Sequence, residues 1–210
     1  MKNVVLVGYG KMGSSIAQGW MLKSLNFNFF VIEKESSLRS IAVRDGLQSY
    51  ESVEELLKFV SKETLDIIFL AVKPQQMSKT IKVFSRIDLS DTLFISIAAG
   101  LSFDWFQSTL NKEIKIVRAM PNLPASVGFG LTGYCQTSNV NEIETQDTQE
   151  LLSAFGKAVY LGSEALIDVV TAISGSGPAY VFYFDEALSM IGVNQGIYRN
   201  DAKQLAIAII

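Results

Sequence analysis

The sequence predicts an α/β protein in which a doubly wound, mostly parallel sheet is followed by an all-helical segment. Over the first 160 residues, short and continuously apolar runs alternate with amphipathic stretches. This alternation is typical of βαβ units whose strands are covered on both faces. After Gly162 the chain becomes long, apolar and helical in pattern. We therefore expect two domains, residues 1–161 and residues 162–210.

Each predicted strand is a short run rich in branched and aromatic residues. The parallel strands are expected at Val4–Val7, Phe29–Ile32, Ile67–Val72, Leu93–Ala98 and Ile114–Val117, with a weaker strand at Leu47–Tyr50. The glycine-rich segment Val127–Cys135 predicts a late antiparallel strand, and Ala158–Leu161 predicts the last strand.

The segments between the strands carry helical periodicity. Helices are expected at Met12–Lys23, Ser37–Arg44, Ser52–Ser61, Gln76–Ser85, Phe103–Leu110 and Glu142–Phe155. Ser52 is the expected N-cap of its helix, with Glu55 as a capping-box partner.

The C-terminal segment is predicted as a long helix over Glu164–Gly192, interrupted at Ser174–Pro178. A proline at the start of its second half suits the first turn of a helix. A last helix begins near Asn200 and remains apolar up to Ile210. A helical pattern that stops without a cap predicts an incomplete domain, or one that another chain completes.

Composition excludes several classes of function. The net charge is −3 and no basic block occurs, so neither nucleic acid nor an anionic membrane is expected as a partner. The single cysteine, Cys135, fits a reducing compartment, and the cytoplasm is the expected location. The chain has no histidine, which excludes histidine zinc sites and Ser-His-Asp triads, and we expect no metal.

A glycine motif follows the first predicted strand directly. Gly8, Gly10 and Gly13 form the pattern GxGxxG between that strand and the first predicted helix. In such a Rossmann-type unit the first glycine permits the tight turn, the second lets phosphates approach the backbone, and the third lets helix and strand pack closely. The sequence therefore predicts a dinucleotide site at the N-terminus of this helix.

Glu33 lies twenty residues after Gly13, at the end of the second predicted strand. A carboxylate there accepts hydrogen bonds from ribose hydroxyls and repels a 2′-phosphate, which favours NAD(H). Lys34, the next residue, could contact such a phosphate, so the sequence leaves NAD(H) and NADP(H) both open. Both residues could also be plain surface charges.

Three further loops follow predicted strands and should meet the glycine motif at one edge of the sheet. They contain Ala71-Val72-Lys73-Pro74, Ser96-Ile97-Ala98-Ala99-Gly100 and Arg118-Ala119-Met120-Pro121-Asn122. Their small side chains and prolines suit a crevice that admits a flat nicotinamide ring.

The segments VGYGKMG, AVKPQ, SIAAG, RAMPN and SGSGPAY, in this order and spacing, resemble the pyrroline-5-carboxylate reductase family. The resemblance extends over all 210 residues. It implies reduction of the cyclic imine Δ1-pyrroline-5-carboxylate to L-proline by NAD(P)H. It also implies a homo-oligomer that forms through C-terminal helices of a dimerisation domain.

The resemblance also implies roles for single residues. Gly8, Gly10, Lys11, Met12 and Gly13 would hold the pyrophosphate, and Ala71, Val72, Lys73 and Pro74 would contact ribose and nicotinamide. Ala99 would lie under the ring and Asn122 would orient groups near it. Glu164, Ser174 and Gly175 are weaker candidates at the junction of the two domains, where structure is favoured over catalysis.

The expected reaction suits a chain without histidine, because the imine nitrogen of the substrate can already be protonated. The family pattern includes a downstream loop similar to Ser-Pro-Gly-Gly-Thr-Thr, which binds the substrate carboxylate and carries a threonine candidate for catalysis. No such loop occurs up to Ile210, so no catalytic residue is assigned. Members of the family also commonly prefer NADPH, in contrast to what Glu33 indicates.

Two alternatives remain open. One is a non-catalytic NAD(P)-binding relative that lacks the substrate loop. The other is an oxidoreductase similar to the β-hydroxyacid dehydrogenases, although the lysine which that family carries on a helix has no counterpart between Ala158 and Ala202.

Overall fold

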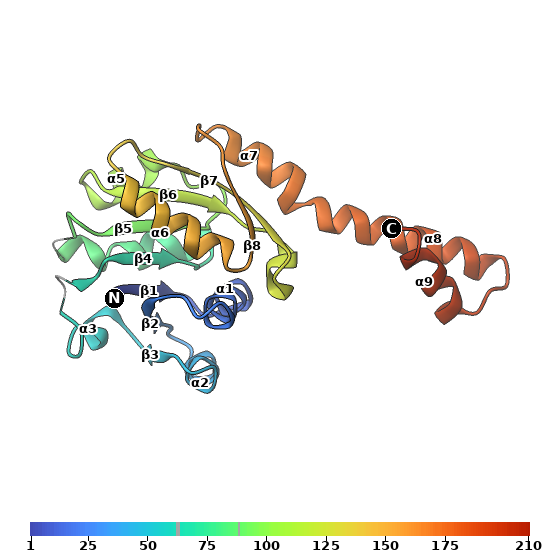
Figure 1. Ribbon diagram of the computed structural model, residues 1–210, viewed down its shortest axis with the longest axis horizontal. Coiled ribbons are helices and arrows are strands. Elements are labelled where there is room, and N and C mark those ends of the chain that lie inside the picture. Colours follow the sequence, from blue (N-terminus) through green and yellow to red (C-terminus); the bar gives the residue numbers. More distant parts are fainter. Residues whose placement is uncertain (62–63, 88) are drawn as a thin grey trace.

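The chain folds into an α/β unit from which a helical arm projects (Figure 1). The structure is a computed structural model, and it describes residues 1–61, 64–87 and 89–210. In the first view the α/β unit lies on the left and the helices of the last residues extend to the right, away from the sheet.

One sheet of eight strands organises the α/β unit, in the order β3-β2-β1-β4-β5-β6-β7-β8. The strands are β1 (Lys2–Val7), β2 (Phe27–Ile32), β3 (Gln48–Tyr50), β4 (Ile67–Leu70), β5 (Leu93–Ser96), β6 (Lys115–Met120), β7 (Gly130–Gln136) and β8 (Gly156–Tyr160). Strands β1 to β6 are mutually parallel, whereas β7 runs antiparallel to β6 and parallel to β8. This confirms the predicted doubly wound, mostly parallel sheet. The chain direction across the sheet reverses between β1 and β4, which is where such folds bind ligands.

Helices cover the two faces of this sheet. The helices of the α/β unit are α1 (Lys11–Leu22), α2 (Ser36–Arg44), α3 (Val53–Leu56), α4 (Pro74–Ile81), α5 (Phe103–Leu110) and α6 (Glu142–Ser153). Three of them, α1, α2 and α6, contribute side chains to one apolar core, and α3, α4 and α5 contribute to a second.

Strand β1 shows why its sequence is continuously apolar. Val4 and Leu6 lie in the first core, whereas Val5 and Val7 lie in the second. Successive side chains of a strand point to opposite faces, so a strand covered on both faces needs apolar residues at every position.

Several predicted boundaries were wrong. Helix α3 was expected to reach residue 61 but ends at Leu56, because the next amides bond three residues back: Phe59 N–H donates to the Leu56 carbonyl. Its N-cap was correct, since the Ser52 hydroxyl accepts from the Glu55 N–H. Strand β6 continues to Met120, and short 3-10 turns occupy η2 (Phe84–Arg86) and η3 (Leu123–Val127).

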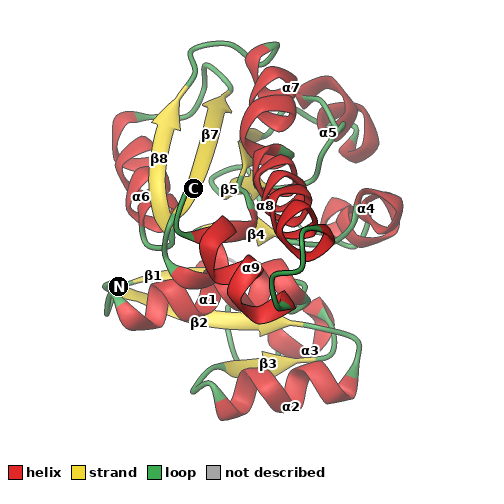
Figure 2. Cartoon of the chain, turned by 90° about the vertical axis from the view of Figure 1, so that its right-hand side faces the viewer, coloured by secondary structure: helices red, strands yellow, loops and turns green. Residues whose placement is uncertain are grey.

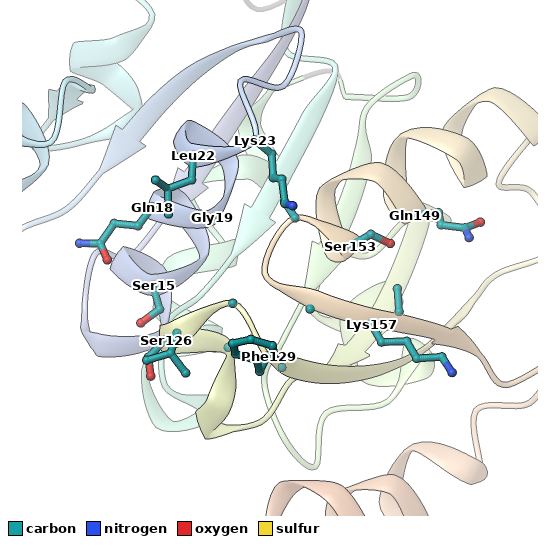
Figure 3. Close-up of a pocket in the computed structure, with 17 residues that line it drawn as sticks. Ser15, Gln18, Gly19, Leu22, Lys23, Ser126, Phe129, Gln149, Ser153 and Lys157 are labelled. Atoms are coloured by element: carbon teal, nitrogen blue, oxygen red, sulfur yellow. The ribbon is translucent and has the colours of Figure 1, made fainter.

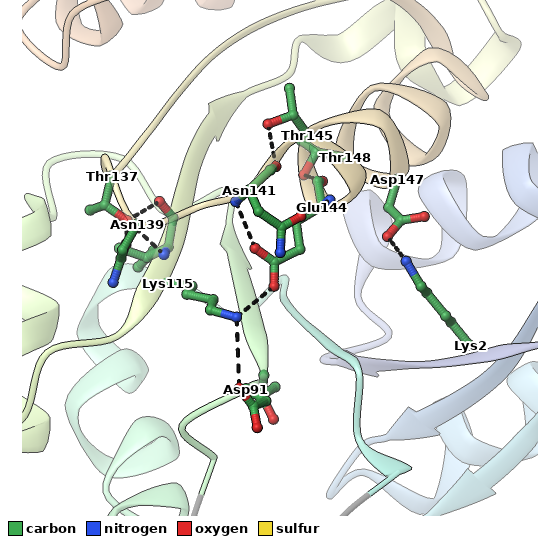
Figure 4. A network of polar contacts seen from close by, with 12 residues as sticks. Lys2, Asp91, Lys115, Thr137, Asn139, Asn141, Glu144, Thr145, Asp147 and Thr148 are labelled. Carbon is green, nitrogen blue, oxygen red and sulfur yellow. Dashed lines mark hydrogen bonds and ion pairs between the residues drawn. The ribbon is translucent and has the colours of Figure 1, made fainter.

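Polar contacts tie α6 to the sheet (Figure 4). Asn141 and Glu144 form a reciprocal capping box at its start. The Glu144 carboxylate also accepts from the Lys115 ammonium of β6 at 2.8 Å, and Asp147 pairs with Lys2 of β1. These contacts fix α6 over strands that lie far from it in the sequence.

The arm consists of α7 (Leu166–Val170), a π-helical turn η4 (Thr171–Gly175), α8 (Gly177–Asn194) and α9 (Arg199–Ile207). The interruption predicted at Ser174–Pro178 is thus a π turn and a bend at Ser176, not a loop. Helix α9 folds back along α8 (Figure 2). No residue of α8 is buried, and Phe182, Tyr183 and Ile209 are among the large apolar side chains exposed on the arm.

Candidate cofactor-binding site

The glycine loop between β1 and α1 has the geometry that the motif requires. Gly8 has a φ of +99°, and a Cβ there would come within 2.9 Å of the Ala71 carbonyl oxygen. A Cβ on Gly13 would lie 2.2 Å from the Gly8 carbonyl oxygen. Both glycines are therefore needed by the fold itself, for the turn and for the close contact between helix and loop.

Gly10 is different, because a Cβ there would meet no atom of the described structure within 4 Å. It is the N-cap of α1, and no side chain caps that helix. The free N–H groups of the first turn and the positive end of the helix dipole face this open space, and together they favour an anion. Lys11 is exposed beside it and Met12 is partly buried.

The buried side chain of Tyr9 anchors the glycine loop, a role that the sequence analysis missed. Its ring is buried, and its hydroxyl donates to Asp45 Oδ2 at 2.6 Å, just after α2. Burial, with the carboxylate of Asp45 as a second cause, raises the pKa of this phenol well above its ordinary value. An apolar residue between two motif glycines could have signalled such an anchor.

Glu33 follows β2 and reaches the glycine loop. Its Oε2 atom accepts from the Tyr9 N–H at 2.7 Å, and its Oε1 atom accepts from the Glu35 N–H at 3.0 Å. Glu33, Lys34 and Gly8 line a cavity of about 440 Å³ that extends over Ser52 to α4. The residues predicted to contact ribose thus line a cavity beside the glycine loop.

The loop after β4 contacts the glycine loop directly. Ala71 N–H donates to the Val7 carbonyl at 2.8 Å, and the Val72 side chain approaches the Gly8 position. Lys73 is exposed at the N-cap of α4, and Pro74 is the first residue of that helix. The structure therefore brings Ala71, Val72, Lys73 and Pro74 to the point where the strand order reverses.

The loop after β5 lies next along the same edge. Ile97 N–H donates to the Leu70 carbonyl at 3.2 Å, which holds this loop beside the one after β4. Ala99 is exposed, and Gly100 has a φ of +73°. A small exposed side chain at this position leaves the edge of the sheet open above it.

Asn122, after β6, is fully engaged within the protein. Its side-chain Nδ2 donates to the hydroxyl and carbonyl oxygens of Ser174, and its Oδ1 accepts from the Leu131 N–H at 2.8 Å. Ser174 is buried inside the π turn, while Gly175 is exposed. These contacts join the edge of the sheet to the arm.

A second junction joins the segment before α7 to α5 and β6. Glu164 Oε1 accepts from Arg118 Nη1 and from the Phe103 N–H, each at 2.7 Å. Arg118 was predicted to lie in a loop, but it belongs to β6 and is 5 % exposed. Sequence analysis could not pair it with Glu164, because only the crossing of α7 over the sheet brings the two together.

A second cavity, of about 1060 Å³, lies elsewhere in the described structure (Figure 3). It is lined by residues of α1, η3, α6 and β8, among them Gln18, Phe129 and Lys157, and it contains none of the predicted site residues. Within the described ranges there is no cluster of residues that could hold a metal ion, and no helix long and apolar enough to cross a bilayer.

The fold and the edge of the sheet together define an oxidoreductase of Rossmann type that uses a nicotinamide dinucleotide. Family models match the chain in two parts: residues 3–100 match "NADP oxidoreductase coenzyme F420-dependent" and residues 164–210 match "Pyrroline-5-carboxylate reductase dimerisation". The chain belongs to the pyrroline-5-carboxylate reductase family, as its five motifs indicated.

Whole relatives support this assignment. The chain is 34% identical to the pyrroline-5-carboxylate reductase of Aquifex aeolicus, an alignment that covers 97% of the chain and 74% of the relative. It is 36% identical to the enzyme of Escherichia coli, over 98% of the chain and 75% of the relative.

Solved structures agree with the comparison of sequences. The reductase of Coxiella burnetii superposes with a TM-score of 0.86 at 28% identity, over 99% of this chain and 76% of that one. The NADP-bound reductase of Plasmodium falciparum superposes with a TM-score of 0.81 at 32% identity, over 99% and 75%. The chain is therefore an NAD(P)H-dependent oxidoreductase of this family, and the expectation of a nicotinamide cofactor is confirmed.

Proposed function

We propose that the chain reduces the cyclic imine of Δ1-pyrroline-5-carboxylate to L-proline with NAD(P)H, the last step of proline formation. Membership of the reductase family supports this reaction. One observation supports the location of the site: the space over Gly10 is open. Gly10 lies at the N-terminus of α1, which no side chain caps, next to the point where the strand order of the sheet reverses.

The pyrophosphate of the cofactor would bind at Gly8, Gly10, Lys11, Met12 and Gly13. Gly10 leaves room for its oxygens, and the free N–H groups at the start of α1 donate to them. Lys11 adds a positive charge at the exposed rim.

Ribose and nicotinamide would lie along the next two loops. Ala71 and Val72 form a small apolar floor beside Gly8, and Lys73 offers an ammonium group to ribose or to the substrate carboxylate. Pro74 holds the first turn of α4 without needing an acceptor for a backbone N–H. Ala99, exposed at the edge, is the proposed support of the nicotinamide ring.

The remaining candidates position the two parts of the chain relative to each other. Asn122 holds Ser174 of the π turn, next to Gly175, and Glu164 holds Arg118. We assign these residues to the junction rather than to the chemical step, because their polar groups already bond within the protein.

The proposed reaction requires little general acid-base catalysis from the protein. The bound cofactor supplies a hydride to the imine carbon. The chain's own residues hold the dinucleotide along the strand ends, and the protonated imine needs no histidine to become electrophilic. This is consistent with a chain that contains no histidine.

Three features of organisation complete the proposal. The boundary between the dinucleotide domain and the helical domain falls at residues 161 and 162, between the end of β8 and the start of α7. Two copies associate through the exposed apolar faces of α8 and α9, in keeping with the dimerisation family that matches residues 164–210. The reducing cytoplasm suits the lone thiol of Cys135.

The test is the oxidation of NADH and of NADPH by the purified chain, with and without Δ1-pyrroline-5-carboxylate, followed by the nicotinamide absorbance. Oxidation that depends on the imine is the expected result. Binding of the cofactor without turnover would overturn the proposed reaction and identify a non-catalytic relative. Failure to bind either cofactor would overturn the placement of the site as well.

A further inference from the structure

The carboxylate of Glu33 is fixed in place at the adenosine end of the proposed site. Backbone N–H groups hold both of its oxygens, one from the glycine loop and one from the chain that follows β2. Each carboxylate oxygen has a second lone-pair direction available for another donor. A ribose whose pyrophosphate lies over Gly10 would reach these oxygens with its hydroxyl groups.

The guanidinium group of Arg39, which contacts the backbone of Glu33, is already engaged in other interactions. Arg39 Nη1 donates to the carbonyl oxygens of Glu33 at 2.9 Å and of Lys34 at 2.6 Å, and Nη2 pairs with Glu51 at 3.4 Å. Arginine is the residue that usually accommodates a 2′-phosphate at the end of this strand. Here it braces the backbone that carries Glu33 instead.

The cavity is lined by lysines and carboxylates together. Lys34 and Lys79 line the hollow together with Glu33, Glu51 and Glu54. A backbone N–H and the Ser52 hydroxyl lower the pKa of Glu54 below its ordinary value, and the nearby charges of Arg86 and Lys34 contribute to the same shift. The charge of Lys34 is therefore partly matched by Glu54, and the hollow carries three acidic and two basic side chains.

We infer that this chain selects NADH over NADPH, and that Glu33 is the residue that makes the selection. Its carboxylate accepts hydrogen bonds from the ribose hydroxyls of NADH. It repels the doubly charged 2′-phosphate of NADPH, which would have to lie within hydrogen-bonding distance of it. The inference rests on the proposed cofactor site, and it distinguishes this chain from the relative whose structure contains NADP.

The experiment is a calorimetric titration of the full chain with NADH and with NADPH, in the absence of imine. We expect NADH to bind at least about tenfold more tightly, which corresponds to ~1.4 kcal/mol. In Glu33→Gln, a variant that removes the charge and keeps the size, the ratio of the two affinities should shift towards NADPH by at least about tenfold. Glu33→Ser should shift it in the same direction.

The matched control is Glu35→Gln. Glu35 is exposed two residues away, and its side chain bonds to Ser37 rather than lining the hollow. This variant should leave the ratio within about twofold of the unchanged chain, because its charge lies outside the site.

The outcomes separate the inference from the proposed function. Tighter binding of NADPH by the unchanged chain, or an equal shift in both variants at positions 33 and 35, would overturn the role of Glu33 while leaving the cofactor site in place. If neither dinucleotide bound, the site and the selection would both be refuted.

Discussion

The side chain of Asn122 donates to Ser174 twice, to its hydroxyl oxygen at 3.1 Å and to its carbonyl oxygen at 3.3 Å. Asn122 follows β6 at the edge of the sheet, and Ser174 lies in the π turn of the arm. The π turn leaves backbone groups without their usual helical partners, and an amide with two donors can satisfy them. The Asn122 side chain is thus one of the contacts that hold the arm on the α/β unit.

Replacement of Asn122 by alanine should lower the free energy of unfolding by about 2 kcal/mol, because partners in the buried π turn lose their donors. Chemical denaturation measures this loss. Amide hydrogen exchange should also become faster around Ser174 and at Leu131, whose N–H loses its acceptor.

Asn139→Ala is the control for this prediction. Asn139 accepts from the neighbouring Thr137 hydroxyl on the surface. Its replacement should change stability by less than about 0.5 kcal/mol. Equal losses in the two variants would show that Asn122 holds nothing beyond its own loop.

Substitutions at two glycines of the same motif should affect different properties: cofactor binding at Gly10 and stability at Gly13. Gly10→Val should abolish binding of the cofactor at a cost of about 1 kcal/mol or less in stability, because the added side chain enters space that the protein does not fill. Gly13→Ala should destabilise the fold by about 3 kcal/mol, because its Cβ would lie 2.2 Å from the Gly8 carbonyl oxygen. Thermal unfolding and dinucleotide titration of both variants test the pair. Undiminished binding by Gly10→Val would refute the pyrophosphate site.

The ion pair between Arg118 and Glu164 should stabilise the junction strongly. Replacement of Glu164 by alanine removes the nearer partner of the buried guanidinium and leaves only the exposed Asp168 carboxylate, 4.0 Å from Nη2, so it should lower stability by about 3 kcal/mol. Glu164→Gln, which keeps an acceptor for the Phe103 N–H, should lose less. A double-mutant cycle with Arg118→Met isolates the interaction, and strictly additive losses would argue against it.

The thiol of Cys135 should make the fold sensitive to alkali. Burial raises its pKa from the ordinary 9.0 to about 11, although the nearby charge of Arg118 acts in the opposite direction. Above pH 9 the unfolded chain releases this proton while the folded chain keeps it. The stability contributed by the protonated thiol is therefore complete below about pH 9 and is lost as the pH rises towards 11.

Urea denaturation between pH 7 and pH 11 measures this decline, which Cys135→Ala should reduce. A remainder should persist in that variant, because the pKa of Tyr9 is raised as well. The native chain should also resist iodoacetamide at pH 8, whereas the unfolded chain should react. Fast modification of the native thiol would contradict the burial of Cys135.

Most of the fold could be predicted from local sequence patterns. The inner strands of the sheet were visible because all or most of their residues are buried, as in Ile67–Leu70, so apolar runs marked them clearly. The glycine motif predicted a dinucleotide site for a similar reason: part of its steric requirement is local, as in the contact between the Gly13 position and the Gly8 carbonyl oxygen.

Contacts between residues far apart in the sequence could not be predicted. Nothing near Arg118 in the sequence indicates Glu164, and nothing near Tyr9 indicates Asp45. The predicted ends of helices were wrong where the backbone changes from α-helical to another hydrogen-bonding pattern while the amino-acid composition stays the same. This happens at the end of α3 and in the π turn. The apolar pattern of the last helices indicated a surface that another chain could cover. That these side chains are exposed could be seen only in the structure.

The pairing of β1 with β4 has a consequence for how the protein is made. The glycine loop is synthesised before residues 67–70, yet that strand pairs with β1 and completes one side of the loop. Until that strand is synthesised, one edge of β1 keeps its backbone N–H and C=O groups unpaired. A nascent chain that has not yet reached β4 is therefore expected to expose this strand edge to other chains, which favours aggregation.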